Sequence, residues 1–190
     1  MNKKTIILLA AINIISFMSL AQSITVSETM TDPRDGKTYK TVQIGNQNWL
    51  AENLAYKPDS GNYRTYDNKP DNVNLYGYLY EWDIATQVCP VGWHLPTKDD
   101  FEQLLNNYPQ LTGEALATTL LTAGTSRFEA LFAGYCNGNA EFKSKDSETY
   151  FWSSTTRFSN AAWRFSINAN NAEIGIAYRN CGFSVRCIKD

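Results

Sequence analysis

The sequence predicts an α+β domain, and three observations point to this class. A hairpin pattern comes early, apolar residues then recur at helical spacing, and short aromatic and β-branched runs fill the last third. Because the helices come early and most strands come late, we expect both ends of the domain to meet in one antiparallel sheet.

The N-terminal stretch "MNKKTIILLAAINIISFMSLAQS" has the layout of a secretory signal peptide. Two lysines precede an apolar run, and small residues lead up to Ala21, so we expect residues 1–21 to be removed. The alternative is an uncleaved membrane anchor, but the run is shorter than the roughly 20 apolar residues of a spanning helix and is interrupted by Asn13 and Ser16. We therefore expect an exported protein of the periplasm, the outer surface or the medium.

After this cleavage we expect a loose segment, residues 22–34, and one domain, residues 35–190. Removal of the two N-terminal lysines leaves 15 Lys and Arg against 19 Asp and Glu, a net charge of −4. A mildly acidic chain with scattered basic residues is a poor candidate for a nucleic-acid partner. No second segment is apolar enough to cross a bilayer.

The first half of the domain contains a hairpin, a loop and two or three helices. "TYKTVQI" alternates, Gly45-Asn46 favours a turn, and 47–50 returns as the second strand. A polar loop of about eighteen residues follows at 57–74, and a loop of this length is usually functional or held by its own packing. The next stretch predicts a helix, from the spacing of Leu75, Leu79, Trp82 and Ala85.

A second helix is predicted to begin after Thr97. Thr97 has the character of an N-cap, with Asp99 and Asp100 in the first turn, where the helix dipole favours acid. "TGEALATTLLTAG" predicts one or two further helical turns, ended by Gly124. Beyond it, five short runs separated by Asn, Gly and Ser predict antiparallel strands: "FEALFAGYC", "YFWSSTT", "AAWRFSIN", "AEIGIAYRN" and "GFSVRCIKD".

The single histidine, His94, lies five residues after Cys89. A nucleophilic pair needs a third group that orients the imidazole and a thiol of lowered pKa, and the sequence indicates neither. Metal binding needs three or four suitable ligands, which one His and four dispersed Cys do not supply. In an exported chain four cysteines indicate two disulfides, with three possible pairings.

The polar loop supplies the candidate ligand-binding residues. Exposed aromatic rings stack on sugar faces while neighbouring polar groups bind the hydroxyls, although most Trp and Tyr of a small domain belong to its core. The candidate ligand contacts are Tyr63, Arg64, Tyr66, Asp67, Asp71 and Asn72. A structural calcium ion is an alternative use of the oxygens of Asp59, Asp67, Asp71, Asn68, Asn72 and Asn74, but EF-hand spacing is absent and turn-forming caps explain them equally. We expect no catalytic metal and no cofactor.

Several motifs in this order resemble the Fibrobacter succinogenes major paralogous domain family. They are "DGKTYKTVQIGNQNWLAENL", "LYGYLYEWDIATQVCPVGWHLPTKDDFEQL", "FWSSTT", "AWRFSI" and "GFSVRCIKD", and the resemblance covers about residues 35–190. "GWHLPTKDDFEQL" and "GFSVRC" are also similar to motifs of the formylglycine-generating/sulfatase-modifying-factor superfamily. That relation implies a C-type-lectin-like fold with a small twisted antiparallel sheet, two or three short helices and long irregular loops.

The resemblance also implies a disulfide between Cys89 and Cys187, which closes the domain. Cys136 and Cys181 depart from the family pattern, and as an extra pair they suggest a second disulfide. The motif for the reactive cysteine pair of the formylglycine generators is missing, as are the sugar-site signatures of calcium-dependent lectins.

We therefore expect a non-enzymatic binding module that recognises a polysaccharide, a surface glycan or a surface protein. Its contacts would come from the 59–74 loop and the loops near 137–147. The alternatives are a structural or adhesion element without a small ligand, and an oxidase that uses Cys136 or Cys181.

Overall fold

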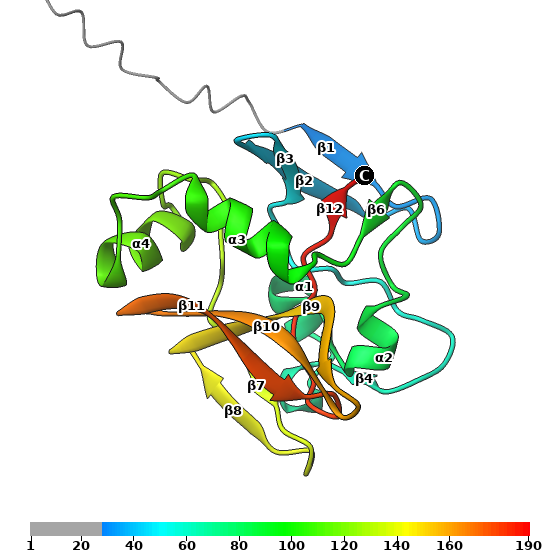
Figure 1. The fold of residues 1–190 in the computed structure, drawn as a ribbon. Coiled ribbons are helices and arrows are strands. Elements are labelled where there is room, and N and C mark those ends of the chain that lie inside the picture. The colour runs from blue at the N-terminus through cyan, green and yellow to red at the C-terminus, as the bar shows by residue number, and fades with distance from the viewer. Residues whose placement is uncertain (1–27) are drawn as a thin grey trace, which may run out of the picture.

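The computed structural model describes residues 28–190, so the predicted signal peptide lies outside the described residues. Two five-stranded sheets and one two-stranded sheet form the domain, with short helices against them (Figure 1). The α+β class is therefore confirmed. The single expected sheet is instead two main sheets.

The first sheet joins both ends of the domain, as predicted. Its strand order is β1-β2-β3-β12-β6. The strands are β1 (Thr29–Thr31), β2 (Thr38–Ile44), β3 (Gln47–Leu50), β12 (Ile188–Lys189) and β6 (Trp93–His94). The β2–β3 hairpin forms where expected, with Gly45 in the left-handed region at φ +60°. β12 lies between β3 and β6, paired antiparallel with each.

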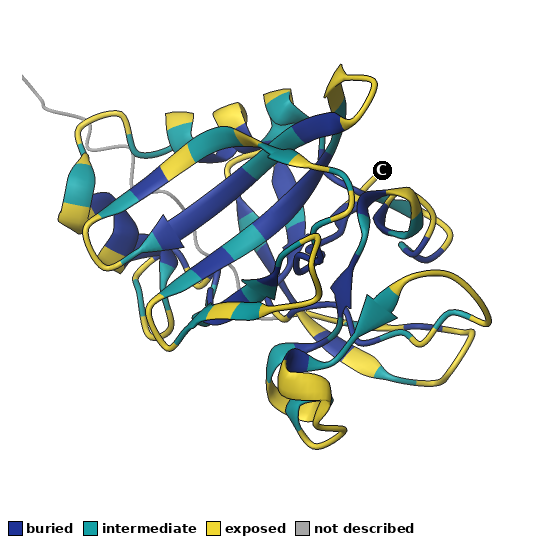
Figure 2. Cartoon of the chain, turned by 90° about the horizontal axis from the view of Figure 1, so that it is seen from below, coloured by how far each residue is buried: buried dark blue, intermediate teal, exposed yellow. Residues whose placement is uncertain are grey.

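The second sheet contains the late strands in the order β11-β10-β9-β7-β8. They are β7 (Ala133–Cys136), β8 (Phe142–Lys145), β9 (Glu148–Phe158), β10 (Ala161–Asn168) and β11 (Asn171–Tyr178). All neighbours pair antiparallel except β7 and β9, which run parallel. Buried positions follow the central parts of the long strands, whereas exposed positions gather at strand ends and loops (Figure 2).

Helices α3 (Lys98–Asn106) and α4 (Gly113–Leu120) lie against one face of the second sheet (Figure 1). Phe101 and Leu104 of α3 and Leu116 and Leu120 of α4 share one core cluster with Phe165 of β10. Successive side chains of a strand point to opposite faces of the sheet. The side chains on the other face of these strands therefore belong to a second core cluster, which also contains residues of the C-terminal segment.

The predicted helix around residues 75–85 is wrong. α1 (Asn72–Tyr76) ends at Gly77, β5 (Leu79–Tyr80) follows, and α2 (Trp82–Ala85) is a single turn. Gly77 adopts φ +71°, and a Cβ at this position would approach the Leu54 carbonyl oxygen to 2.5 Å. This backbone conformation ends the helix. The apolar residues at helical spacing are distributed over a helix, a strand and a second helix. β4 (Tyr63–Arg64) and the 3₁₀ turn at Tyr66–Asn68 also give structure to the polar loop.

The segment expected to be loose is structured where it is described. β1 pairs with β2, and Asp32 is fully buried against the Arg34 guanidinium, 2.6 Å away. Hydrogen bonds from Arg34 lower the pKa of Asp32 and outweigh the opposing effect of burial. The ordered domain therefore begins before residue 35.

The Cys89–Cys187 disulfide is confirmed, with Cα atoms 5.9 Å apart and a sequence separation of 98 residues. The second expected disulfide, between Cys136 and Cys181, does not form, because both residues are free thiols. Cys136 pairs with Gly182, so Cys181 is one residue out of register. Side-chain alternation then directs the two sulfurs into different clusters, Cys136 beside Tyr66 and Cys181 against the second core cluster.

Arg186 is fully buried one residue before the bridged Cys187. Its Nε donates to Asn53 Oδ1 (2.9 Å), its Nη1 to the Leu50 and Phe128 carbonyls, and its Nη2 to the Glu129 carbonyl (2.8 Å). Desolvation lowers the pKa of Arg186 to about 9, which leaves it charged at neutral pH. The guanidinium thus ties the C-terminal segment to β3 and to the loop before β7.

Replacement of Cys89 and Cys187 together by serine should lower the free energy of unfolding by about 4–5 kcal/mol, because the bridge closes a loop of nearly one hundred residues. Urea unfolding with and without dithiothreitol measures this effect. The reductant should destabilise the wild type by a similar amount and leave the double variant unchanged. A wild type that is indifferent to the reductant would contradict this account.

Arg186→Lys should destabilise the fold by about 2 kcal/mol or more, because an ammonium cannot reproduce the planar fork and leaves buried carbonyls without donors. Arg157→Lys, on the exposed end of β9, is the matched control and should change stability by less than about 0.5 kcal/mol. Equal unfolding midpoints for the two variants would show that the guanidinium geometry is unimportant.

Candidate functional site

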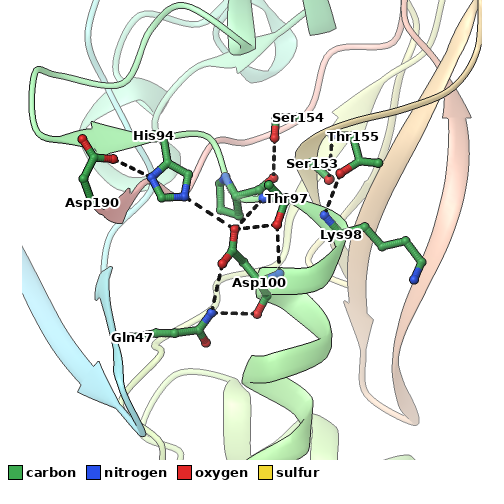
Figure 3. Close-up of polar contacts among 10 residues, drawn as sticks. Gln47, His94, Thr97, Lys98, Asp100, Ser153, Ser154, Thr155 and Asp190 are labelled. Atoms are coloured by element: carbon green, nitrogen blue, oxygen red, sulfur yellow. Dashed lines mark hydrogen bonds and ion pairs between the residues drawn. The ribbon is translucent and has the colours of Figure 1, made fainter.

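His94 lies between two carboxylates, those of Asp190 and Asp100 (Figure 3). Its Nδ1 is 2.7 Å from Asp190 Oδ1, and its Nε2 is 3.5 Å from Asp100 Oδ2. No hydroxyl or thiol of residues 28–190 hydrogen bonds to the imidazole. The sulfur of Cys89 belongs to the disulfide, so Cys89 and His94 do not form a nucleophilic pair.

Asp100 belongs to the capping box of α3, as the sequence predicted for Thr97. The Asp100 backbone N–H donates to Thr97 Oγ1 (3.1 Å), and the Thr97 backbone N–H donates to Asp100 Oδ2 (2.8 Å). Gln47 Nε2 donates to the Asp100 backbone carbonyl (3.0 Å) and connects β3 to this helix start. The His94 network of Figure 3 thus has a structural explanation: it fixes α3 to the first sheet.

The six candidate ligand contacts differ in how far they are exposed to solvent. Tyr66 is buried, its ring centroid 5.1 Å from that of Phe142, so it is unavailable to a ligand. Asn72 Nδ2 donates to the Tyr66 carbonyl (2.8 Å), and the Tyr63 ring packs edge-on against Tyr78. The remaining three are Arg64, which is half-buried, and Asp67 and Asp71, which are exposed. The aromatic side chains of this loop therefore support the fold.

The acidic side chains of the same loop do not converge either. Within residues 28–190, no group of three or more His, Cys, Asp or Glu side chains could hold a metal ion. Asp67 is 3.9 Å from Lys69 Nζ, and Asp71 precedes the first turn of α1. The calcium alternative therefore has no identifiable site in this part of the chain.

The free cysteines lack the electrostatics of a reactive thiol. Burial raises the pKa of Cys136 and that of Cys181, which disfavours the thiolate of each. The positive charge of Arg64 acts in the opposite direction on the pKa of Cys136 and does not reverse the effect of burial.

The exposed aromatic side chains lie instead at one end of the second sheet. Phe158 is 56% exposed and Tyr178 65% exposed, and both pair directly with the small Ala161. Trp163, two residues along β10, pairs with Ile176, which is 43% exposed. Directly paired residues and residues two apart share a face. These five positions therefore form one surface, which we call the aromatic platform: Phe158, Ala161, Trp163, Ile176 and Tyr178.

The platform continues the face that α3 and α4 cover elsewhere. Phe165 lies on the same face two residues beyond Trp163 and is buried beneath α3. Lys98, at the start of α3, places its Nζ 5.3 Å from the Trp163 ring centroid, and the Arg157 guanidinium lies 4.9 Å from that of Phe158. The platform begins where the helices stop, with cations at its border.

A polar cleft of about 440 Å³ adjoins the platform at Tyr178. It is lined by Glu81, Asp83, Ser159, Asn160, Tyr178, Arg179 and Asn180. Arg179 organises it, since its Nη1 donates to the Ser159 carbonyl (3.0 Å), its Nη2 contacts Asp83, and its guanidinium covers the Trp82 ring at 3.8 Å. Carboxylate and amide groups therefore lie beside an exposed ring.

Sequence reasoning missed the platform although its signal was present. The predicted strand "YFWSSTT" stops two residues before Phe158, whereas "AEIGIAYRN" contains Ile176 and Tyr178. Which rings stay uncovered depends on where α3 and α4 pack on β10 and β11, and the sequence does not show this placement.

A comparison with protein families matches the Fibrobacter succinogenes major domain over residues 42–189. The chain belongs to the Fibrobacter succinogenes major domain family. The family region thus includes α3, the whole second sheet and the bridged cysteines, whereas β1 precedes it. No curated protein and no solved structure matches the chain significantly. No helix within residues 28–190 has the length and hydropathy required to cross a membrane.

Thr97→Ala should lower the free energy of unfolding by about 1 kcal/mol, because it removes the cap that fixes the start of α3. Thr97→Ser keeps the accepting oxygen and is the conservative control, with a change of a few tenths of a kcal/mol. Thermal unfolding of both variants measures the difference. An alanine variant as stable as wild type would contradict the role of the capping box.

Proposed function

We propose that this family member is an exported, non-enzymatic module that binds a glycan chain through the aromatic platform. The observation that carries the proposal is the exposure of Phe158 and Tyr178 on one face of a rigid sheet, beside a cleft rich in carboxylate and amide groups. Exposed rings favour stacking on the apolar faces of sugar rings, while the polar side chains suit hydroxyl groups.

The rigidity of the platform supports recognition without a catalytic step. Phe158, Trp163 and Tyr178 lie on paired strands, so a ligand orders few backbone groups when it binds. The arrangement around Cys89, His94, Cys136 and Cys181 favours no covalent or redox step, because two sulfurs are bridged and burial opposes ionisation of the other two.

Export to the envelope or the exterior is part of the same proposal. The predicted signal peptide at residues 1–21 and the disulfide that closes the domain both suit an oxidising compartment. We also infer the C-type-lectin-like arrangement as the finer description of the fold. Its support is the meeting of β1–β3 with β12 in one sheet, and the bridge from the segment before α3 to the residue that precedes β12.

Tyr178→Ala and Phe158→Ala should each weaken glycan binding by about tenfold or more, because each removes an exposed ring at the centre of the contact. A glycan array identifies the ligand, and titration calorimetry with that glycan gives the affinities. Val91→Ala, which truncates an exposed side chain outside the platform, is the control and should bind like wild type.

Two outcomes would count against the proposal. Glycan binding that survives both alanine substitutions would place the contact elsewhere on the domain. A silent array, together with capture of a protein partner or assembly of the domain itself, would favour the structural or adhesion alternative.

A further inference from the structure

A second recess, distinct from the platform, is a cavity of about 510 Å³. It lies between β2, the end of β3, α1 and the loop before β7. Its volume falls within the range of small-molecule sites. The residues that the argument uses are Lys37, Lys40, Glu52, Arg127, Glu129 and Arg186, and apolar groups such as Val73 and Leu131 line the rest.

The cationic side chains of this cavity lack acidic partners. Among residues 28–190, no side chain forms an ion pair or hydrogen bond with the charged groups of Lys40 and Arg127. The ammonium of Lys37 lies only over the Tyr39 ring, 5.7 Å from its centroid. These three cations therefore face the cavity with their hydrogen-bonding capacity unused.

The two carboxylates of the cavity are engaged by backbone groups. Glu52 Oε2 accepts from the Lys40 backbone N–H (2.7 Å), and Glu129 Oε2 accepts from the Ala123 backbone N–H (3.0 Å). They fix the surrounding chain and do not neutralise the lysine and arginine side chains directly. Three cations against two anions leave the rim with a net positive charge before the floor is considered.

The floor adds a buried positive charge. Arg186 is fully buried, and its direct partners are carbonyl and amide oxygens without a carboxylate. The charges of Glu52 and Glu129 act on Arg186 without direct contact and do not offset its desolvation, which still lowers its pKa. A further negative charge brought into the cavity therefore interacts favourably with this cation through a medium of low dielectric constant. Rim and floor thus favour the same sign of ligand.

The loop that carries Arg127 is held in an unusual backbone conformation. Arg127 and Glu129 have φ values of +56° and +55°. Non-glycine residues in the left-handed region are strained and persist only where their surroundings fix them. Here the carbonyls of Phe128 and Glu129 point inward to Arg186, while Arg127 lines the cavity. The same loop therefore places Arg127 on the rim of the cavity and binds Arg186 in its floor.

We propose that this cavity binds the carboxylate of a monosaccharide-sized organic acid, held by Lys40 and Arg127 above the buried Arg186. The apolar lining from Val73 and Leu131 suits the carbon skeleton of such a ligand. The carboxylate belongs either to a free sugar acid or to a uronic acid residue of a polysaccharide. The site does not depend on the aromatic platform.

The test is a titration of the wild-type domain with sodium glucuronate, a glucuronate oligosaccharide, methyl glucoside and inorganic phosphate. Backbone amide NMR shifts locate the contact, and calorimetry gives the affinity. We expect both carboxylate ligands to bind, with shifts at Lys40, Arg127 and Arg186, and the neutral glucoside to show none. A stronger response of these cavity amides to the oligosaccharide would identify a polymer as the source of the carboxylate, and an equal response would identify the free acid.

Lys40→Gln and Arg127→Gln should each weaken glucuronate binding by about tenfold, since each removes a hydrogen bond between charged groups. Lys57→Gln removes an exposed charge outside the cavity and should bind like wild type. The proposal is overturned if no carboxylate binds at the cavity, if methyl glucoside shifts the same cavity amides equally, if phosphate binds there and glucuronate does not, or if both cavity variants retain full affinity. Because these variants spare Tyr178 and Phe158, the result stands apart from the outcome for the platform.

Discussion

The buried guanidinium of Arg186 determines how three distant parts of the chain meet. Its donors reach the carbonyl at the end of β3, the Asn53 amide and two successive carbonyls of the loop before β7. Arginine suits this place because its planar fork serves several acceptors from one charge. Loss of the fork would leave buried carbonyls without donors, so the loop conformation, the cavity and the position of the last strand depend on this one side chain.

The segment from Gly182 to Ile188 extends the same constraint across the molecule. Gly182 pairs with Cys136, Phe183 with Tyr80, and Ser184 with Phe151, so the segment contacts the second sheet and the small sheet before it enters the first. Cys187 then closes the disulfide, and Ile188 pairs with Trp49 and His94. Every residue from 182 to 188 is buried. The two sheets are therefore joined by an extended segment that pairs with strands of both.

Local chemistry made part of the fold predictable. Gly45 marks a turn, Thr97 with Asp100 marks a helix start, and the late runs alternate as strands do. The split into two sheets was not predictable, because it depends on the path of the residues near 182–188 between them. The helix prediction at 75–85 failed because Gly77 takes a left-handed conformation that apolar spacing does not reveal. The Cys136–Cys181 prediction failed on register, since one residue of offset reverses the face of a strand.

The candidate site was less predictable than the fold. Composition indicates many aromatic rings but not which of them are covered. Tyr66 was predicted to be exposed and is buried, whereas the exposed Phe158 and Tyr178 were not among the predicted contacts. The cations of the cavity could not be predicted from the sequence either. Lys40 and Arg127 are 87 positions apart, and only the folded chain brings them to one cavity.

The late position of the buried connector also orders events during biosynthesis. Because residues 182–188 supply contacts to both sheets, the earlier strands cannot complete their packing while those residues are still inside the ribosome. Folding therefore waits for the end of the domain, and a topology of such distant contacts is expected to form slowly. The Cys89–Cys187 disulfide can form only after that final segment has emerged, so oxidation of the two sulfurs is the closing step of folding.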